Sequence, residues 1–427
     1  MKDKVSELQR MLYDMAKADP NRRFHSLYDK IWRIDVLNAA WKQVKQNGGT
    51  YGVDHITIQD IKKNEEAELA EIQTELRTKT FKPSPLRRAY IPKSNGKMRG
   101  LGIPTIKDRI VQTAIKIVIE PIFESGFEPN SYGFRPDKSA HDAVDNIAKY
   151  LNFGCENVID ADITGCFDNI PKHELMEQIS KRISDGAMLH IIRQFLDAGI
   201  MEGNEIHNTD RGTPQGSPLS PLLANIYLDQ LDKQWKASGL ENRNREDAHL
   251  IRYADDFVIL VKGSAETAKI KLDEIMETID LTLNKEKTRI VKAEEGFDFL
   301  GFRFVRKYSK RRGKRTTRWY PSPRSEQKIK EKIRELTDKS KLSIMTPEQA
   351  KEQLIPLLRG WGNYFAHSTV STKLYEIWDY AQRRLMYLYC RQHNKPRTWK
   401  YRDIKKRHLY IVDTLPRTIA SNRHKAM

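Results

Sequence analysis

Apolar residues recur at helical spacing along most of the chain, and runs of β-branched residues interrupt them in its middle part. Apolar residues three and four positions apart predict helices, and we expect them at 1–20, 27–46, 64–78, 108–123, 139–151, 171–183, 186–198, 222–235 and 264–279. Short β-branched runs predict strands, expected at 86–91, 157–165, 249–261, 281–291 and 297–305. After residue 320 the pattern predicts only helices, at about 324–340, from 346 onward and at about 372–391.

Local signals support several of these boundaries. Ser139, Ser264 and the sequence Thr346-Pro347-Glu348-Gln349 have the residue types that cap helix N-termini. Asn95-Gly96, between two short strands, is typical of a tight hairpin turn.

The stretch at 249–261, HLIRYADDFVILV, carries two adjacent acids between two apolar runs. The pattern predicts two strands joined by a tight turn. Adjacent side chains in a strand point to opposite faces, so Asp255 and Asp256 converge only if a turn bends the backbone between them. Carboxylate oxygens are the ligands that Mg²⁺ prefers. The alternative is a solvated hairpin tip, because Asp is common in turns.

A second acidic strand supports the metal hypothesis. Residues 157–167 read NVIDADITGCF, with Asp160 and Asp162 near the strand end. Asp162 is a candidate third ligand, since carboxylates that hold two metal ions are a recurrent device for phosphoryl transfer. We interpret Asp160 as structural, and a strand that ends in exposed acids is the alternative.

Spaced motifs in one order resemble the reverse transcriptases encoded by group II introns. They are YIPK at 90–93, RGLGIP at 99–104, SYGFRP at 131–136, the acidic strand with Phe167-Asp168, GTPQGSPLSP at 212–221, YADD at 253–256 and FLGF at 299–302. RGWGNYF at 359–365 resembles the signature of the maturase domain. The resemblance covers residues 27–305 strongly and 320–390 more weakly.

The resemblance implies an α+β fold: a right-hand polymerase of fingers, palm and thumb, with an antiparallel palm sheet followed by an all-α three-helix thumb/maturase domain. We expect an N-terminal extension and the start of the fingers at 1–80, and the fingers and palm at 81–305. A basic linker or hairpin and the helical domain are expected at 306–394, and a basic nucleic-acid-binding tail at 395–427.

The resemblance also implies roles for individual residues. Asp162, Asp255 and Asp256 would bind two Mg²⁺ ions, with Mn²⁺ as a substitute, and the backbone carbonyl of Ile163 would complete one shell. The FLGF motif would help hold the primer strand, and the alternative is that this aromatic-rich strand is simply part of the core. The residues expected to bind the incoming dNTP are Arg87, Lys93, Arg99, Ile163, Phe167 and Gln215, with Phe167 as the ring that excludes a 2′-hydroxyl. Basic residues of a solvated hairpin, a turn glutamine and a core phenylalanine are the alternatives.

Charge is distributed unevenly. Residues 306–427 hold 31 Lys and Arg against 10 Asp and Glu, a balance of +21, whereas the preceding residues have a balance of −3. A polyanion is the natural partner of such a segment. We expect the C-terminal part to bind RNA or DNA.

Bulk properties narrow the class further. The 427 residues contain no apolar run long enough for a membrane helix. The N-terminus lacks a signal-peptide pattern, so we expect a cytoplasmic ribonucleoprotein without membrane contact. Cys155, Cys166 and Cys390 are too scattered for a disulfide framework or zinc site, and we expect no paired-cysteine endonuclease module.

The predicted function is RNA-directed DNA synthesis by two-metal nucleotidyl transfer, together with binding of intron RNA to assist splicing and mobility. The expected partners are RNA template and primer, group II intron RNA, target DNA and dNTPs. Two alternatives stay open: a non-enzymatic RNA-binding splicing cofactor, and a domesticated reverse transcriptase in repair or defence. Three retained carboxylates count against the first, because a binding-only protein does not need mutually repelling acids.

Overall fold

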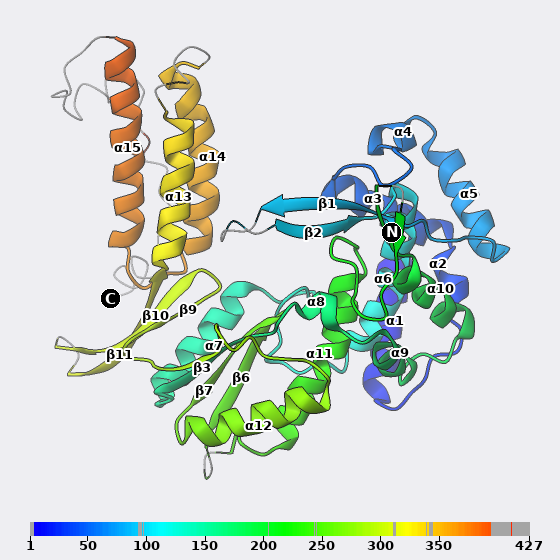
Figure 1. Ribbon diagram of the computed structural model, residues 1–427, viewed down its shortest axis with the longest axis horizontal. Helices are drawn as coiled ribbons and strands as arrows, with labels where there is room; N and C mark the ends of the chain where they lie inside the picture. The colour runs from blue at the N-terminus through cyan, green and yellow to red at the C-terminus, as the bar shows by residue number, and fades with distance from the viewer. Residues whose placement is uncertain are drawn as a thin grey trace.

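The computed structural model describes residues 4–92, 96, 98–203, 205–242, 244, 246–310, 313–338, 340, 345–393 and 411. Figure 1 shows three parts: a mixed sheet-and-helix body at the bottom, a unit of helices and a β-hairpin on the right, and an upright group of three helices on the left. These parts correspond to the palm, fingers and thumb of a right hand. Within the described part of the chain, no helix has both the length and the apolar character needed to cross a membrane.

The palm sheet has four antiparallel strands in the order β6-β7-β3-β8. Their bounds are β3 Asn157–Asp162, β6 Ala248–Tyr253, β7 Asp256–Val261 and β8 Arg289–Lys292. Alternate residues of a strand face opposite sides, and here both sides are buried. Ile159 and Ile259 belong to one hydrophobic core and Val158 and Val258 to a second. The antiparallel palm sheet predicted from the sequence is therefore confirmed.

Helices cover both faces of this sheet. The first core contains apolar residues of α11 (Ser220–Ala237) and α12 (Ala265–Thr278), and the second contains those of α7 (Ala140–Phe153). Ser139 and Ser264 cap their helices as predicted. Each side chain accepts a hydrogen bond from the backbone nitrogen of the residue three positions later. Short α8 (Cys166–Asn169) follows β3 directly.

The fingers combine N-terminal helices with a small sheet of order β2-β1-β4-β5. Its elements are α1 Lys4–Ala18, α2 Tyr28–Ile31, α3 Ile34–Asn47, α4 Ile58–Lys63, α5 Glu65–Arg77, β1 Leu86–Pro92, β2 Met98–Ile103, α6 Ile106–Glu124, α9 Lys172–Ser180, α10 Gly186–Asp197, β4 Ile200–Glu202 and β5 Glu205–His207. Strands β1 and β2 form an antiparallel hairpin, in which Arg87 is opposite Ile103 at one end and Pro92 is opposite Met98 at the other.

A second small sheet links the palm to the thumb, with the order β11-β10-β9. It consists of β9 Phe297–Phe299, β10 Phe302–Ser309 and β11 Lys314–Pro321. The thumb follows as α13 Pro323–Leu336, α14 Pro347–Phe365 and α15 Thr372–Gln392, which matches the predicted three helices. Thr346 forms the predicted capping box with Gln349.

Some predicted boundaries were wrong. The helix expected at 27–46 is broken into α2 and α3 at Trp32-Arg33, and the strand expected at 297–305 is two strands with a turn at Leu300-Gly301. The strand expected at 281–291 is regular only in β8. The domain boundary proposed at residue 306 lies inside β10. The proposed tail at 395–427 lies outside the described residues except for Ile411.

Candidate active site

The YADD stretch forms the predicted hairpin turn between β6 and β7. Tyr253 pairs with Asp256 across the hairpin, and Ala254 has a φ of +57°, which lets the chain reverse in two residues. On the other side of β7, Asp256 is the register partner of Asp162 in β3. Directly opposite residues of antiparallel strands have close side chains. The three predicted carboxylates therefore share one end of the palm sheet.

A buried arginine supports the turn from below. Arg252 is 1% exposed, and its guanidinium donates from Nη1 to the Ala254 carbonyl at 2.9 Å. The same group donates to Asp232 of α11 from Nε at 3.0 Å and to Asn225 Oδ1 at 3.0 Å. The sequence pattern did not lead us to this residue, although a charged residue within an otherwise apolar strand was a usable signal for a buried ion pair.

The SYGFRP segment supports the turn from the side. The backbone nitrogen of Tyr132 donates to the Arg252 carbonyl at 2.9 Å, and the Asn225 side chain donates to the Gly133 carbonyl at 2.8 Å. A Cβ atom on Gly133 would overlap the backbone nitrogen of Ala254. The glycine thus allows two backbones to touch beside the carboxylates.

Burial and neighbouring negative charge raise the pKa values of Asp255 and Asp256. Burial, followed by the charge of Asp162, raises the pKa of Asp255, and Arg99 opposes the shift. Desolvation, followed by the charges of Asp255 and Asp162, raises the pKa of Asp256 to about 6. The Asp256 side chain is nevertheless exposed to solvent, which screens part of this effect. Because the carboxylates repel each other, a nearby cation stabilises their ionised forms.

Lys287 supplies one such positive charge. Its Nζ lies 2.7 Å from Asp162 Oδ2, and its charge opposes the rise in the pKa of Asp256. In the described part of the chain, no three Asp, Glu, His or Cys side chains are grouped closely enough to hold a metal ion as they stand. Carboxylate oxygens are the donor type that Mg²⁺ prefers, and a metal ion bound at Asp162 would have to displace Lys287. No sequence signal distinguished Lys287 from its neighbours.

Asp160 behaves as the structural acid of its strand. Its Oδ2 pairs with Arg289 of β8 at 3.2 Å. The side chain therefore engages the neighbouring strand, in agreement with its interpretation from the sequence.

Two of the predicted nucleotide-binding residues contact each other. Arg99 Nε donates to Gln215 Oε1 at 2.5 Å, and the Gln215 amide donates to both Asp168 oxygens at 2.9 Å. The positive charge of Arg99 also opposes the rise in the pKa of Asp255. The polar groups of Arg99, Gln215 and Asp168 therefore connect the fingers hairpin with the carboxylates. Asp168, which follows Phe167, was not predicted as a functional residue.

The other predicted contacts lie in different surroundings. Arg87 donates to the Tyr51 carbonyl at 2.9 Å, and its guanidinium lies 4.6 Å from the Tyr51 ring centre. Phe167 is 9% exposed and belongs to the first hydrophobic core. Lys93 lies outside the described residues.

The pairing of Ile163 sets the direction of its backbone carbonyl. Ile163 forms an isolated bridge with Leu283, flanked by hydrogen bonds from Thr164 to Thr282 and from Asn284 to Asp162. In this kind of pair the carbonyl points away from the partner segment. It therefore points toward the side of the sheet where β7 begins.

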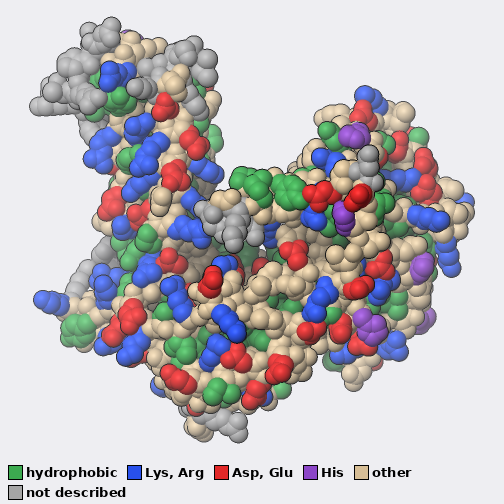
Figure 2. All heavy atoms as spheres, in the orientation of Figure 1, with side chains coloured by type: hydrophobic (Ala, Val, Ile, Leu, Met, Phe, Trp, Pro, Cys, Tyr) green, Lys and Arg blue, Asp and Glu red, His purple; other side chains and the backbone are tan. Residues whose placement is uncertain are grey.

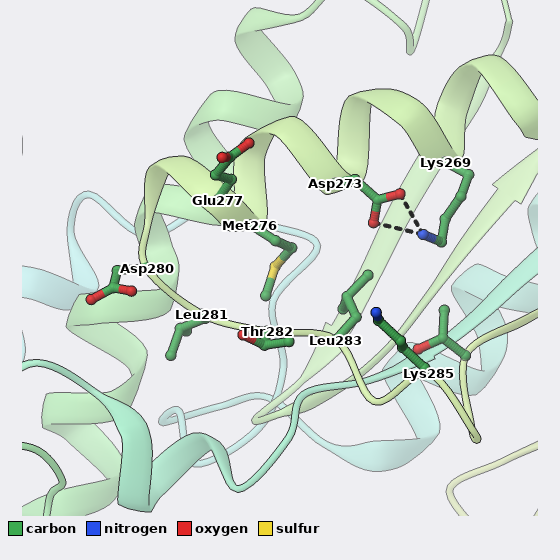
Figure 3. Close-up of a pocket in the computed structure, with 10 residues that line it drawn as sticks. Lys269, Asp273, Met276, Glu277, Asp280, Leu281, Thr282, Leu283 and Lys285 are labelled. Atoms are coloured by element: carbon green, nitrogen blue, oxygen red, sulfur yellow. Dashed lines mark hydrogen bonds and ion pairs between the residues drawn. The ribbon is translucent and has the colours of Figure 1, made fainter.

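A cavity of about 280 Å³ is lined in part by Gln215, one of the residues predicted to bind the nucleotide. It lies between β1–β2 and the loop at 212–215, and Asp168 and Gln215 are among its lining residues. A separate groove of about 550 Å³ runs beside α12 and the following segment (Figure 3). Lys269 and Asp273 pair on its wall, and none of the predicted site residues lines it.

Fold and site together define a right-hand nucleic-acid polymerase, and the comparisons narrow the class. Residues 91–304 match the reverse transcriptase (RNA-dependent DNA polymerase) family, and residues 326–409 match the group II intron maturase-specific domain. The chain belongs to the group II intron reverse transcriptase/maturase family and is an RNA-directed DNA polymerase. This confirms the family predicted from the motifs.

Individual relatives agree. The chain is 34% identical over 341 residues to protein YkfC of Escherichia coli (strain K12), a match that covers 72% of this chain and 90% of that protein. It is 33% identical over 364 residues to the group II intron-encoded protein LtrA of Lactococcus lactis subsp. cremoris, covering 71% of this chain and 60% of LtrA. The chain thus spans most of YkfC and about three fifths of LtrA.

Proposed function

We propose that this protein copies an RNA template into DNA, using Asp162, Asp255 and Asp256 to hold two Mg²⁺ ions. The observation that carries the proposal is the register pairing of Asp162 with Asp256, directly beside Asp255 at the hairpin turn. In the reaction the primer 3′-hydroxyl attacks the α-phosphorus of a dNTP, a new phosphodiester bond forms, and pyrophosphate leaves. Bound metal ions would lower the pKa of the attacking hydroxyl and stabilise charge on the phosphates.

The side chains around the carboxylates suit binding of a dNTP. Arg99 places a permanent positive charge beside Asp255, and Gln215 fixes its guanidinium through a hydrogen bond. A guanidinium in this position neutralises phosphate charge as the transfer proceeds. Lys93 and Arg87 would add charge from the same hairpin once Arg87 leaves Tyr51. Phe167 would exclude ribonucleotides from this pocket.

We further propose that the thumb unit binds intron RNA and assists splicing and mobility, with intron RNA, target DNA and the primer-template as partners. The match of residues 326–409 to the maturase-specific domain supports this role. Figure 2 shows Lys and Arg side chains along the visible face of α13–α15, and the surface is hollowed between these helices and the β1–β2 hairpin. The balance of +21 after residue 305 favours a polyanionic partner.

The decisive experiment is Asp255→Asn, which removes one charge and keeps the side-chain shape. We expect primer extension on an RNA template with Mg²⁺ to fall by about 100-fold or more, because a metal site contributes several kcal/mol. RNA binding should be unchanged. Asp160→Asn is the matched control on the neighbouring strand and should extend primers. Extension by Asp255→Asn near the wild-type rate would overturn the carboxylate assignment.

The same variant separates the two activities. If the protein assists splicing of an intron RNA, Asp255→Asn should retain that assistance, since folding RNA needs no dNTP chemistry. A splicing assay on the intron that surrounds the reading frame measures this, and loss of both activities together would argue for one shared site.

A further inference from the structure

The FLGF motif forms an unusual turn between β9 and β10. Leu300 has a φ of +49° and Gly301 a φ of +79°, so two consecutive residues are left-handed. Glycine adopts this conformation without penalty, but a leucine does so only when its surroundings impose it. The pairing of β9 with β10 favours such a turn, and contacts from outside the turn can offset the cost of the left-handed leucine.

The thumb supplies those contacts. Tyr364 of α14 donates its hydroxyl hydrogen bond to the Leu300 carbonyl at 2.8 Å. Ser325 of α13 donates from Oγ to the Gly301 carbonyl at 2.9 Å, and the Ser322 backbone nitrogen donates to the same carbonyl at 2.8 Å. Both turn carbonyls are thus bound by the helical unit and its N-cap.

Packing around the turn is equally specific. The Phe302 ring lies 5.4 Å from the Tyr364 ring and 4.9 Å from the Phe365 ring, centre to centre. A Cβ on Gly301 would approach Ser325 Oγ to 3.0 Å. Burial, with a smaller contribution from Tyr253, raises the pKa of Tyr364 to about 12. The hydroxyl therefore stays protonated and donates throughout the neutral pH range.

The turn adjoins the active site. Tyr253 of the YADD hairpin, Leu300 and Tyr364 all pack against the same hydrophobic core. The His141 ring of α7 also donates a hydrogen bond from Nε2 to the Tyr364 carbonyl, at 2.8 Å. Palm, turn and thumb therefore meet at a single aromatic cluster.

We propose that Tyr364 and Ser325 are positioning residues for polymerisation: they hold the Leu300-Gly301 turn in the left-handed form that places the primer 3′ end. The proposal rests on the proposed polymerase function and on the primer contact that the family resemblance implies for FLGF. It makes the helical unit, which also carries the maturase match, part of the machinery that aligns the primer. Primer alignment then depends on how α13 and α14 are docked.

The test uses the full chain with Tyr364→Phe, Ser325→Ala and the double variant. Tyr364→Phe keeps the ring packed on Phe302 and removes one hydrogen bond. Tyr375→Phe is the matched control, since Tyr375 is an exposed tyrosine of the same unit. Single-nucleotide addition is measured at saturating dNTP, with the Kd of the primer-template and the KM for dNTP determined separately.

We expect each single variant to lower the rate of addition by roughly fivefold, the effect of one hydrogen bond. The primer-template Kd and the KM for dNTP should stay close to wild type because the binding surfaces are intact, and the thermal midpoint should fall by no more than the loss of one hydrogen bond explains. The control should match wild type in every measurement. A kinetic loss without a binding loss distinguishes positioning from general support of the fold.

The outcomes are separable. If wild type itself fails to extend a primer, the proposed function is wrong and the inference falls with it. If wild type extends and both variants add nucleotides at the same rate, only the inference is wrong, and packing alone holds the turn. If Tyr364→Phe loses more thermal stability than one hydrogen bond explains, its rate does not test the inference. The rate of Ser325→Ala, which removes a single oxygen, is then the test. A loss of rate that follows a loss of primer-template affinity would also overturn the inference.

Discussion

Two aspartates one helical turn apart on α11 should respond to the same substitution with opposite signs. Asp232 pairs with the buried Arg252 that supports the YADD turn, and both side chains are 1% exposed. Asp229 is also buried, but its partner Lys233 is 56% exposed at the side chain. We predict that Asp232→Asn destabilises the protein and that Asp229→Asn stabilises it at neutral pH.

The magnitudes follow from the surroundings. Asp232→Asn removes the carboxylate that is hydrogen-bonded to the buried Arg252 guanidinium and leaves only the more distant charge of Asp229, and breaking such a buried pair costs about 3–5 kcal/mol. For Asp229, desolvation raises the pKa to about 6 from 3.8. At 1.36 kcal/mol for each pH unit, the ionised form costs the fold up to about 3 kcal/mol at pH 7. Asparagine removes that cost but keeps a polar group, so we expect a gain of about 1 kcal/mol.

The pH dependence of the unfolding free energy tests whether each substitution stabilises or destabilises the protein as predicted. A carboxyl whose pKa is raised by folding binds its proton more tightly in the folded state, so its contribution favours folding below pH 3.8 and is lost as the pH rises through about 6. The advantage of Asp229→Asn over wild type should therefore be full above pH 6 and vanish near pH 4. Asp232→Asn should be destabilised across this range, since Arg252 stays charged.

The assay is urea unfolding followed by tryptophan fluorescence, at several pH values and without added metal. Asp232→Asn should also lower primer extension, because Arg252 donates to the Ala254 carbonyl in the turn, whereas Asp229→Asn should extend normally. The reasoning is refuted if both variants shift stability in the same direction at pH 7, or if the Asp229→Asn advantage persists at pH 4.

Three further predictions test other parts of the structure. Phe167→Ala should admit ribonucleotides, measured as the ratio of rNTP to dNTP incorporation, and a soluble variant that still rejects them would place the gate elsewhere. Gly133→Ala should displace the hairpin at Ala254, cost about 1–3 kcal/mol and lower extension, and a fully active variant would contradict the close approach of the two backbones. Removal of residues 395–427 should make the dependence of log Kd on log salt shallower by about 0.7–0.9 for each phosphate group that the shortened protein no longer binds, and an unchanged slope would assign the footprint to the helices.

Much of the palm was predictable because its signals are local. A strand's alternation and a turn's residue types depend on neighbours in sequence, so the YADD hairpin and the acidic strand were both placed correctly. The caps at Ser139, Ser264 and Thr346 are equally local and were also correct. These features fix where the acids lie.

Contacts between distant segments were not predictable from the same signals. Nothing in the sequence around Arg87 shows that its guanidinium would lie on Tyr51, and the pattern at 297–305 hid the turn at Leu300-Gly301. An apolar run interrupted by a Leu-Gly pair looks like one strand until the thumb contacts are known. The turn is accompanied by tertiary hydrogen bonds from Tyr364, Ser325 and Ser322, which the local sequence pattern does not show.

Lys287 shows the same limit at the active site and explains how the acids coexist. Three carboxylates at one sheet end repel each other, and this repulsion adds to burial, the larger cause, in raising the pKa values of Asp255 and Asp256. Lys287 offsets it at Asp162 and Asp256, and Arg99 offsets it at Asp255. The Lys287 side chain is 64% exposed, so it can withdraw into solvent at little cost. An exposed cation can therefore stabilise the acids in the free protein and yield its place to Mg²⁺, which a buried partner such as Arg252 could not do.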